Sequence, residues 1–341
     1  MKNEYIGVLP DRRSAKEKEK DWQADELLTS SSVVAPKFRK VKKGKWNKYT
    51  VRDQDGSGSC VSQALAKGFE VLYKKETGKT VQFSATPIYQ KRRNRPDAGM
   101  YIVDAFEIAV KHGTCPEKNC KSLLMTDAQM DAVVLPSNFE DINNFLDAIA
   151  FVSIKKDFDF IARWVEENGY AQLHIAADRR SWSKDFPSLG SKNRGIRHAV
   201  AVVDAVTYEG VQYLVIEDSW GEFGEFKGQR LISREVFNDM YTSAAGFTVL
   251  KYDITDAKFS PFSFPMEFGQ RSPEIVRLQD FLKARGFFPS NQQSTGFYGH
   301  VTALAVYNFQ IANAVASPVE LNQLKGKRVG QKTLTSINAQ L

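Results

Sequence analysis

Apolar positions follow a helical period in the first part of residues 46–253 and a strand period in the second. The helical pattern predicts one helix from Val61 to about Lys75, a second in MYIVDAFEIAVKHG and a third in DFDFIARWVEENG. Gly113 and Gly169 close the second and third patterns, where a glycine typically ends a helix. The apolar face of the first helix consists of Val61, Ala64, Leu65, Phe69 and Leu72.

The second half of this region is rich in β-branched and aromatic residues. Strands are predicted in YAQLHIAA, HAVAVVDAVTYEGVQYLVIEDSW, GQRLIS and GFTVLKYD, and TYEG is typical of a hairpin turn between two strands. Helices come first and strands follow, which predicts an α+β domain with segregated halves for residues 46–253.

The segments on either side have different patterns. Residues 1–45 are polar and aperiodic, and we expect a basic or polar N-terminal arm on the surface. Pro, Ser and Phe without a period predict a linker over residues 254–268. Residues 269–341 show three short helical patterns, enough for one small independent core.

The composition is that of a soluble globular protein of 341 residues, with 42% hydrophobic and 26% charged residues. No apolar run is long enough to cross a bilayer, and the N-terminus lacks the apolar stretch of a secretory signal peptide. Three cysteines are too few for a disulfide framework, although Cys115 and Cys120 can either bridge locally or stay reduced. The spacing of Cys and His argues against zinc, so no metal or organic cofactor is expected.

Basic residues are concentrated in PKFRKVKKGKWNK, residues 36–48, which contain seven Lys or Arg and no acidic residue. Such a run can bind nucleic acid or another anionic polymer. Its few aromatic residues do not suggest a base-stacking platform, which favours a solvated arm.

Cys60 follows the polar loop VRDQDGSGS and directly precedes the first predicted helix. A thiol at a helix N-terminus meets the positive end of the helix dipole and unpaired backbone N–H groups, which favour the nucleophilic thiolate. A buried structural cysteine would more naturally lie on the apolar face of the helix. We therefore interpret Cys60 as a nucleophile.

A nucleophilic cysteine needs a base and a group that orients the base. His198 opens a strand, and Asp218 ends the next one, so a hairpin of this length can bring the two together. The Trp220 indole is placed to cover the pair, and Gln54 is placed to donate to an oxyanion together with the Cys60 N–H.

These motifs resemble the papain-like cysteine peptidases over residues 46–253. The match consists of Gln54 six residues before Cys60, His198-Ala199-Val200 at the start of a strand, and Asp218-Ser219-Trp220-Gly221 after the next. The resemblance implies a two-lobed domain, with a helical lobe and a β-barrel-like lobe. It also implies a catalytic set of Cys60, His198, Asp218 and Gln54. Gly99, Met100 and Trp220 would be substrate-binding residues.

Several positions depart from the family pattern. Asp218 stands where Asn is usual, Val61 where Trp is usual, and Ser57 where a cysteine is usual; Met100 replaces one glycine of a pair. A carboxylate can still orient His198. No long inhibitory pro-domain is expected, because the N-terminal arm is short and lacks a helical pattern. A relative that binds but no longer cleaves is the alternative.

The C-terminal segment resembles the small three-helix peptidoglycan-binding domains. The matching residues are Leu278-Gln279, Leu282, Gly286, Thr295-Gly296, Tyr298-Gly299, Thr302, Ala305-Val306, Phe309-Gln310, Gly330 and Thr333. Most of these positions make the fold, and related domains also serve as protein-interaction modules. The motif therefore identifies the fold, and wall binding is implied only because members of the family typically bind peptidoglycan.

Together the two resemblances predict a monomeric cysteine-type endopeptidase that acts on protein or peptide substrates and is tethered to cell wall peptidoglycan. A phage or bacterial murein endopeptidase or amidase, or a non-catalytic wall-binding protein, is the alternative. The expected location is the cell wall, the extracellular space or a phage virion. No specific nucleic acid partner is expected.

Overall fold

A computed structural model of the chain describes residues 5–19, 21–27, 35–135, 148–190, 195–249, 261–289 and 292–341. The chain forms two compact units, Met1–Thr248 and Val249–Leu341, and each is described by itself. Among the described helices, none combines the length and apolar character needed to cross a membrane.

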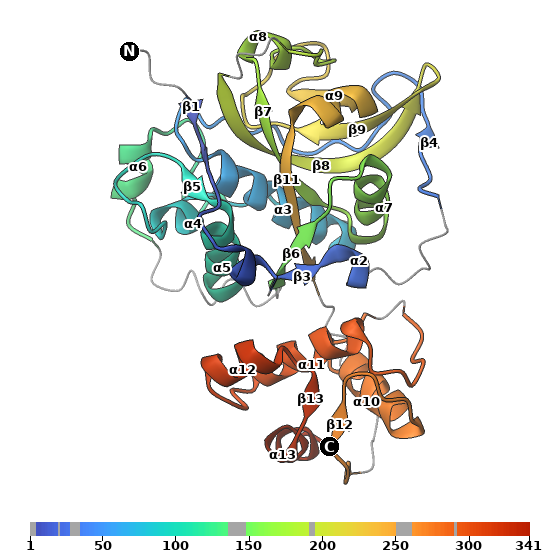
Figure 1. Ribbon diagram of the computed structural model, residues 1–341. Coiled ribbons are helices and arrows are strands. Elements are labelled where there is room, and N and C mark those ends of the chain that lie inside the picture. The colour runs from blue at the N-terminus through green and yellow to red at the C-terminus, as the bar shows by residue number, and fades with distance from the viewer. Residues whose placement is uncertain are drawn as a thin grey trace. The chain divides into compact units, whose positions relative to one another are not determined.

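The larger unit is organised around a twisted sheet of mostly antiparallel strands (Figure 1). Its path through the described residues is β10-β9-β8-β7-β11-β6-β3. These strands are β3 (Trp22–Gln23), β6 (Ala148–Ile154), β7 (Ala171–Ala177), β8 (Ile196–Tyr208), β9 (Val211–Glu217), β10 (Gln229–Ser233) and β11 (Tyr241–Val249). The β8–β9 hairpin turns at Glu209 and Gly210, so the turn predicted at TYEG is confirmed.

Helices α4, α5 and α6 gather on one side of this unit, and the long strands β7, β8 and β9 lie on the other (Figure 1). The helices of the unit are α1 (Ala15–Lys18), α2 (Ala24–Leu27), α3 (Cys60–Thr77), α4 (Thr86–Gln90), α5 (Ile102–His112), α6 (Asp127–Ala132), α7 (Phe158–Asn168), α8 (Arg179–Trp182) and α9 (Arg234–Met240). The three predicted helices correspond to α3, α5 and α7. Gly113 and Gly169 end the last two with positive φ.

Helix α3 packs against β8, β7 and α5, and it is buried on nearly all sides. The predicted apolar face is buried, but so are the polar side chains on the opposite face. Lys67 forms ion pairs with Glu70 at 2.9 Å and with Glu217 of β9 at 3.7 Å. An amphipathic pattern alone predicts a solvated polar face, whereas here that face meets buried polar partners.

Much of residues 1–45 is not the surface arm that the sequence predicts. Four short strands there pair in parallel with the fold: β1 (Tyr5–Ile6) and β4 (Arg39–Lys40) with β8, β2 (Val8–Leu9) with β5 (Met100–Tyr101), and β3 with β6. Trp22 is also buried. An extended segment without apolar periodicity can dock in this way because its backbone N–H and C=O groups complete the strand edges. Residues 1–4, 20 and 28–34 of the expected arm lie outside the described residues.

Part of the basic run 36–48 is also neutralised within the unit. Arg39 pairs with Asp204 at 2.6 Å, and Lys43 pairs with Glu225 at 2.7 Å. Trp46 is buried and donates from Nε1 to Gln229 Oε1 at 2.9 Å. The run is therefore anchored at several points rather than wholly solvated.

The smaller unit consists, in its described residues, of four helices and a two-stranded sheet. These are α10 (Pro273–Ala284), α11 (His300–Ala312), α12 (Pro318–Leu324), α13 (Gln331–Asn338), β12 (Met266–Glu267) and β13 (Arg328–Val329). The three predicted helices correspond to α10, α11 and α13, and α12 lies in the segment between the last two. Residues 254–260 of the predicted linker lie outside the described residues. Phe262 already belongs to this unit, because it is buried and bonds twice to Asn338.

The same hydrogen-bonded arrangement occurs twice in the smaller unit. Gln279 of α10 donates to the hydroxyl of Thr302 on α11 at 2.8 Å, and Gln310 of α11 donates to the hydroxyl of Thr333 on α13 at 2.9 Å. In each pair the two residues are 23 positions apart in the sequence, and both pairs are buried. In each pair the threonine stands three residues after a glycine at the helix N-cap. These motif residues therefore join consecutive helices.

We predict that Gln310→Ala loosens the smaller unit. It removes two hydrogen bonds, to Thr333 and to the Arg328 carbonyl, and a buried group left unpaired costs about 1–3 kcal/mol. Amide hydrogen exchange across α11 and α13, read by mass spectrometry, should quicken about tenfold or more. Gln323→Ala on the exposed side of α12 is the matched control, and equal exchange in both variants would contradict this role.

Candidate active site

Cys60 is the first residue of α3 and is fully buried. The loop before it is held by its own side chains, because the Ser57 and Ser59 hydroxyls bond at 2.7 Å. Ser59 precedes the helix without a side-chain cap, so the first N–H groups of α3 are not consumed by a capping hydroxyl. The thiol thus lies at the positive end of an 18-residue helix, as the sequence predicts.

His198 and Asp218 come together through the β8–β9 hairpin. Asp218 directly follows β9, whose Glu217 pairs with Ala201 of β8. His198 Nε2 and Asp218 Oδ1 lie 2.6 Å apart, and both side chains are buried. The Cys60 side chain interacts with the His198 ring, and because Nε2 is engaged by Asp218, Nδ1 is the nitrogen left for the thiol. The three residues are therefore arranged in series.

The electrostatics of this series favour a charged imidazole. Burial lowers the pKa of His198, but the charge of Asp218 and the hydrogen bonds to Asp218 and Cys60 outweigh burial and raise it to about 9. The ordinary value is 6.5. Because the folded pKa is the higher one, these contacts stabilise the fold fully below about pH 6.5, and that contribution is lost as pH rises through about 9.

Asp218 has further partners that the sequence analysis does not identify. Trp182 of α8 donates from Nε1 to Asp218 Oδ2 at 2.9 Å, and Arg230 of β10 forms an ion pair with the same oxygen at 2.9 Å. The Ser219 N–H donates to Asp218 Oδ1 at 2.7 Å. Burial raises the pKa of Asp218, yet the cations and these hydrogen bonds hold it well below its usual range. The carboxylate is thus ionised and fixed from several sides.

Trp220 lies over the His198 ring, with ring centroids 5.0 Å apart and an interplanar angle of 36°. Its backbone pairs with Asp53 in the loop that precedes Cys60. The predicted placement of this indole beside the His198–Asp218 pair agrees with this geometry.

Gln54 is buried in the same loop and is fixed by several hydrogen bonds. The Ser219 hydroxyl donates to Gln54 Oε1 at 2.6 Å, and Gln54 Nε2 donates to the Ser57 carbonyl at 2.5 Å. The Gln54 N–H donates to the Ser219 carbonyl at 2.9 Å. Because Oε1 accepts from Ser219, Nε2 is identified as the amide nitrogen, and it has a second hydrogen beyond the one given to Ser57.

The N-terminal segment crosses directly over the nucleophile. β1 pairs with β8 at the residues before His198, β2 pairs with β5, and Gly7 lies between them. A Cβ placed on Gly7 would lie 2.3 Å from the Cys60 Sγ, so a glycine is needed for this close approach. The Met100 N–H donates to the Gly7 carbonyl at 3.0 Å. Residues 5–9, which we call the N-terminal strap, therefore cover Cys60.

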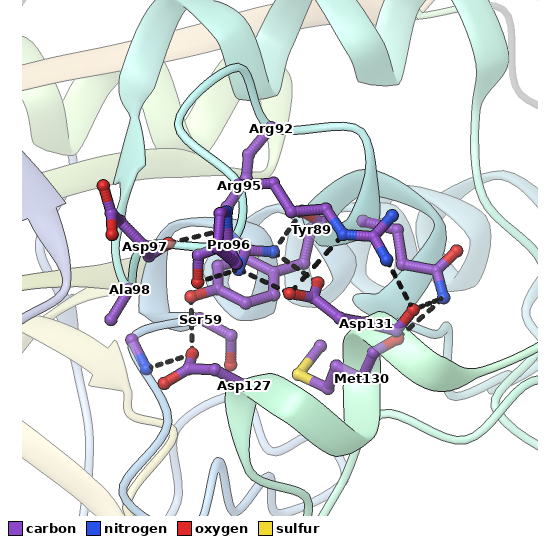
Figure 2. Close-up of polar contacts among 12 residues, drawn as sticks. Ser59, Tyr89, Arg92, Arg95, Pro96, Asp97, Ala98, Asp127, Met130 and Asp131 are labelled. Atoms are coloured by element: carbon purple, nitrogen blue, oxygen red, sulfur yellow. Dashed lines mark hydrogen bonds and ion pairs between the residues drawn. The ribbon is translucent and has the colours of Figure 1, made fainter.

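Gly99 is tied to the loop before Cys60 through Tyr89 and Asp127, and Figure 2 shows the hydrogen bond between these two side chains. The Tyr89 hydroxyl donates to Asp127 Oδ1 at 2.5 Å and accepts from the Gly99 N–H at 3.1 Å. The same Asp127 oxygen accepts from the Gly58 N–H at 2.9 Å. A Cβ on Gly58 would lie 2.3 Å from the Gly99 nitrogen, so the two backbones are in direct contact.

The loop that carries Gly99 is held by a second pair shown in Figure 2. Arg92 bonds to both oxygens of Asp131, at 2.6 and 2.9 Å, and also to the carbonyls of Asp97 and Pro96. Bidentate arginine–carboxylate geometry is strongly directional. Helix α6, which carries Asp127 and Asp131, thus positions both the nucleophile loop and the Gly99 strand.

Cys115 and Cys120 are free, buried and hydrogen-bonded to each other. This contact, with burial, raises the pKa of Cys115, whereas the same contact lowers that of Cys120. Of the two alternatives left by the sequence, the structure contains the unbridged one. Within the described residues, no group of three or more His, Cys, Asp or Glu side chains is arranged to hold a metal ion.

Comparison with known families accounts for most of the larger unit. The model of the papain family of cysteine proteases matches residues 36–246. The chain belongs to this papain family. The match confirms the family predicted from the cysteine, histidine and aspartate motifs, and it identifies the chain as a cysteine protease domain with a hydrolase activity.

Solved structures support the papain-like α+β fold. Xylellain, a cysteine protease from Xylella fastidiosa, aligns with a TM-score of 0.59 and 17% identity, covering 73% of this chain and 97% of that one. The cysteine protease and lectin-like domains of Cwp84, a surface layer associated protein of Clostridium difficile, align with a TM-score of 0.50 and 19% identity. The alignment covers 64% of this chain and 54% of that one. A comparison with curated protein sequences gives no match.

We predict that deleting residues 1–9 exposes Cys60. With the N-terminal strap gone, Cys60 should react with iodoacetamide at least about tenfold faster, because the backbone at Gly7 no longer covers the sulfur. Mass spectrometry of the Cys60 peptide over a time course measures the rate. Deleting residues 1–4 alone keeps β1 and β2 and should leave the rate unchanged; acceleration by this control would show that the strap is not the barrier.

Proposed function

We propose that the chain is a latent papain-family peptidase whose catalytic triad is Cys60, His198 and Asp218, and that its smaller unit tethers it to bacterial peptidoglycan. The observation that carries the first part is the position of the His198 ring, which lies 2.6 Å from Asp218 Oδ1 and interacts with Cys60. A nucleophile, its base and the group that orients the base are thus in direct contact.

In this mechanism the Cys60 sulfur attacks the carbonyl carbon of a peptide bond after its proton has passed to His198 Nδ1. The imidazolium returns that proton to the leaving amine, and a thioester joins the acyl group to Cys60. Water activated by His198 then hydrolyses the thioester and regenerates the thiol. Asp218 holds the imidazole in the tautomer with Nδ1 toward the sulfur and stabilises the imidazolium.

The tetrahedral intermediate needs donors for its oxyanion. The Cys60 N–H, at the start of α3, and the second Nε2 hydrogen of Gln54 are the two donors that we propose. The contacts of Gln54 with Ser219 and Ser57 support this role, because they hold the amide rigidly without using both of its hydrogens. Gly99 and Met100 offer backbone groups to an extended peptide, and Trp220 covers the His198 ring.

The N-terminal strap makes the structure that of a latent enzyme. It occupies the Met100 N–H, a group that we propose binds substrate, and it covers the sulfur at Gly7. β1 and β2 are only two residues long each, so the segment can leave without disrupting the sheet. Activity therefore requires displacement or removal of the strap.

We predict that His198 activates Cys60. In the 1–9 deletion, Cys60 should be alkylated rapidly at pH values below about 8.5, the region of an ordinary free thiol, and the advantage should disappear in His198→Ala. It should also fade as pH rises through about 9, where His198 loses its proton. The same variants should differ in hydrolysis of fluorescein-labelled casein.

Cys115 and Cys120 are internal controls in this experiment, because their peptides are quantified in the same digests. Slow labelling of Cys60 in both proteins, increasing only near the free-thiol region, would contradict the triad. It would leave a papain-like protein that binds without cleaving.

For wall tethering, the support is the agreement between the peptidoglycan-binding motif and the smaller unit. The motif glutamines and threonines form its repeated buried contacts, as a domain of that fold requires. We expect the full chain to sediment with purified murein sacculi, whereas a chain that ends at residue 260 should stay in the supernatant. The experiment is repeated at raised salt, which screens electrostatic attraction through the basic run 36–48 and so separates it from binding by the smaller unit. Equal sedimentation of the two proteins would overturn the tether.

A further inference from the structure

Arg230 is a fully buried arginine behind the catalytic pair. It lies on β10, where it pairs with Ile216 of β9, two residues before Asp218 along the neighbouring strand. Its Nη2 is 2.9 Å from Asp218 Oδ2. The strand register, rather than a flexible loop, thus brings a cation to the side of the carboxylate that faces away from His198.

The surroundings of Arg230 are aromatic. Its guanidinium carbon lies 3.7 Å from the ring centroid of Phe223, 4.9 Å from that of Trp182 and 5.6 Å from that of Trp220. Within the described residues, none of its three guanidinium nitrogens has a hydrogen bond of good geometry, so the ion pair with Asp218 is its main polar contact. A buried cation in such a site depends strongly on its counter-charge.

The two carboxylate oxygens of Asp218 have separate roles. Oδ1 meets His198 and the Ser219 N–H, whereas Oδ2 meets the Trp182 indole and Arg230. One oxygen therefore faces the reacting groups and the other is anchored. A neutral side chain at position 218 would leave Arg230 without its counter-charge, and a neutral side chain at position 230 would leave Asp218 facing His198 with its full charge.

We propose that Arg230 is a positioning residue of the catalytic site, the counter-charge that allows a carboxylate rather than a neutral amide to orient His198. This inference rests on the proposed triad. Arg230 offsets part of the negative charge of Asp218, while Oδ1 remains a strong hydrogen-bond acceptor for the imidazole. Asp218 and Arg230 are thus a matched pair, and changing either alone should be worse than changing both.

The direction of the electrostatic effect follows from the charges. Removing the cation strengthens the pull of Asp218 on the imidazolium, so the pKa of His198 should rise further. The charged and titratable groups that face or flank His198 and this pair are Cys60, Asp218, Arg230, Asp185, Arg179 and Arg197. Asp185 also attracts Arg230, but at longer range, since it forms no ion pair with it within 4.0 Å among the described residues.

The test compares Arg230→Met, Asp218→Asn and the double variant in the full chain. Each single change breaks a buried ion pair and should lower the Tm of the larger unit by roughly 6–20 °C, whereas the double variant should regain most of that loss. This recovery is the signature of a matched pair in a double-mutant cycle.

The second readout is the pH dependence of Cys60 alkylation, measured for the same variants in the 1–9 deletion, where the strap no longer covers the sulfur. A merely structural role would not move it. In Arg230→Met the pH at which the labelling advantage over His198→Ala fades should shift upward by about one unit, and in the double variant it should return toward the wild type. A lowered Tm with an unmoved pH profile would overturn the positioning role. If the single variants change both the Tm and the pH profile and the double variant recovers neither, the matched pair is overturned.

Arg234 and Asp159 provide the matched control, since they form a bidentate pair of the same residue types at 2.7 and 2.8 Å but are exposed. Arg234→Met, Asp159→Asn and their double variant should show little coupling in Tm and no change in the pH profile. Cys60 labelling in the wild type that is independent of His198 would refute the proposed triad, and with it the positioning role. The coupling between Asp218 and Arg230 in Tm would still be measured, so the two failures are distinguishable.

Discussion

The larger unit depends on the burial of helix α3 on nearly all sides. A helix enclosed in this way must have partners for its polar side chains, and several of those partners come from the segment that leads to Cys60. Glu70 accepts from the backbone N–H and hydroxyl of Thr50, and Gln63 accepts from Arg52 at 2.9 Å. The chain from residue 50 to Cys60 is therefore tied to the helix that it introduces. The thiol has a fixed position because the polar face of α3 is satisfied from its own N-terminal loop.

The second constraint is the closeness of backbones around the sulfur. Gly58 touches Gly99, and Gly7 touches Cys60, so three separate segments meet where any side chain would collide. These contacts have unequal support. Gly58 and Gly99 are joined through Tyr89 and Asp127, whereas Gly7 is held only by short strands at the end of the chain. The Gly58–Gly99 contact is thus rigidly supported, whereas the N-terminal strap over Cys60 can be removed. A latent enzyme of the proposed kind requires this difference.

The sequence predicts the fold well, and it singles out the three residues of the proposed triad, because both follow from local patterns. A cysteine at a loop–helix junction, a histidine that opens a strand and an aspartate that ends the next one each stand at a recognisable position, and the papain-like fold is confirmed. Arg230 is different, because in GQRLIS it resembles any arginine on a solvated strand face, and only the register with β9 makes it buried. Tyr89 and Asp127 likewise act through contacts between residues 38 positions apart, which no local pattern reveals.

The N-terminal strap fails to be predicted for a related reason. Its strands contain two residues each, too few to show any period, and the informative residue is a glycine whose role is to have no side chain. For helix α3 the pattern is clear but misleading, because its amphipathic period predicts a solvent-exposed polar face and that face is buried. Periodicity reports which side chains are apolar, and it does not report whether polar ones find buried partners.

The two motifs in this chain carry different kinds of information. In the larger unit the motif residues Cys60, His198 and Asp218 are polar, buried and bonded to one another, so the motif describes chemistry as well as fold. In the smaller unit the amide nitrogens of the motif glutamines donate to threonine hydroxyls and backbone carbonyls within the unit itself. Groups satisfied in this way have little left to offer a ligand. Under the proposed tether, recognition of a wall polymer therefore falls to side chains outside the motif, and for this reason the motif supports the fold of the smaller unit more strongly than it supports its ligand.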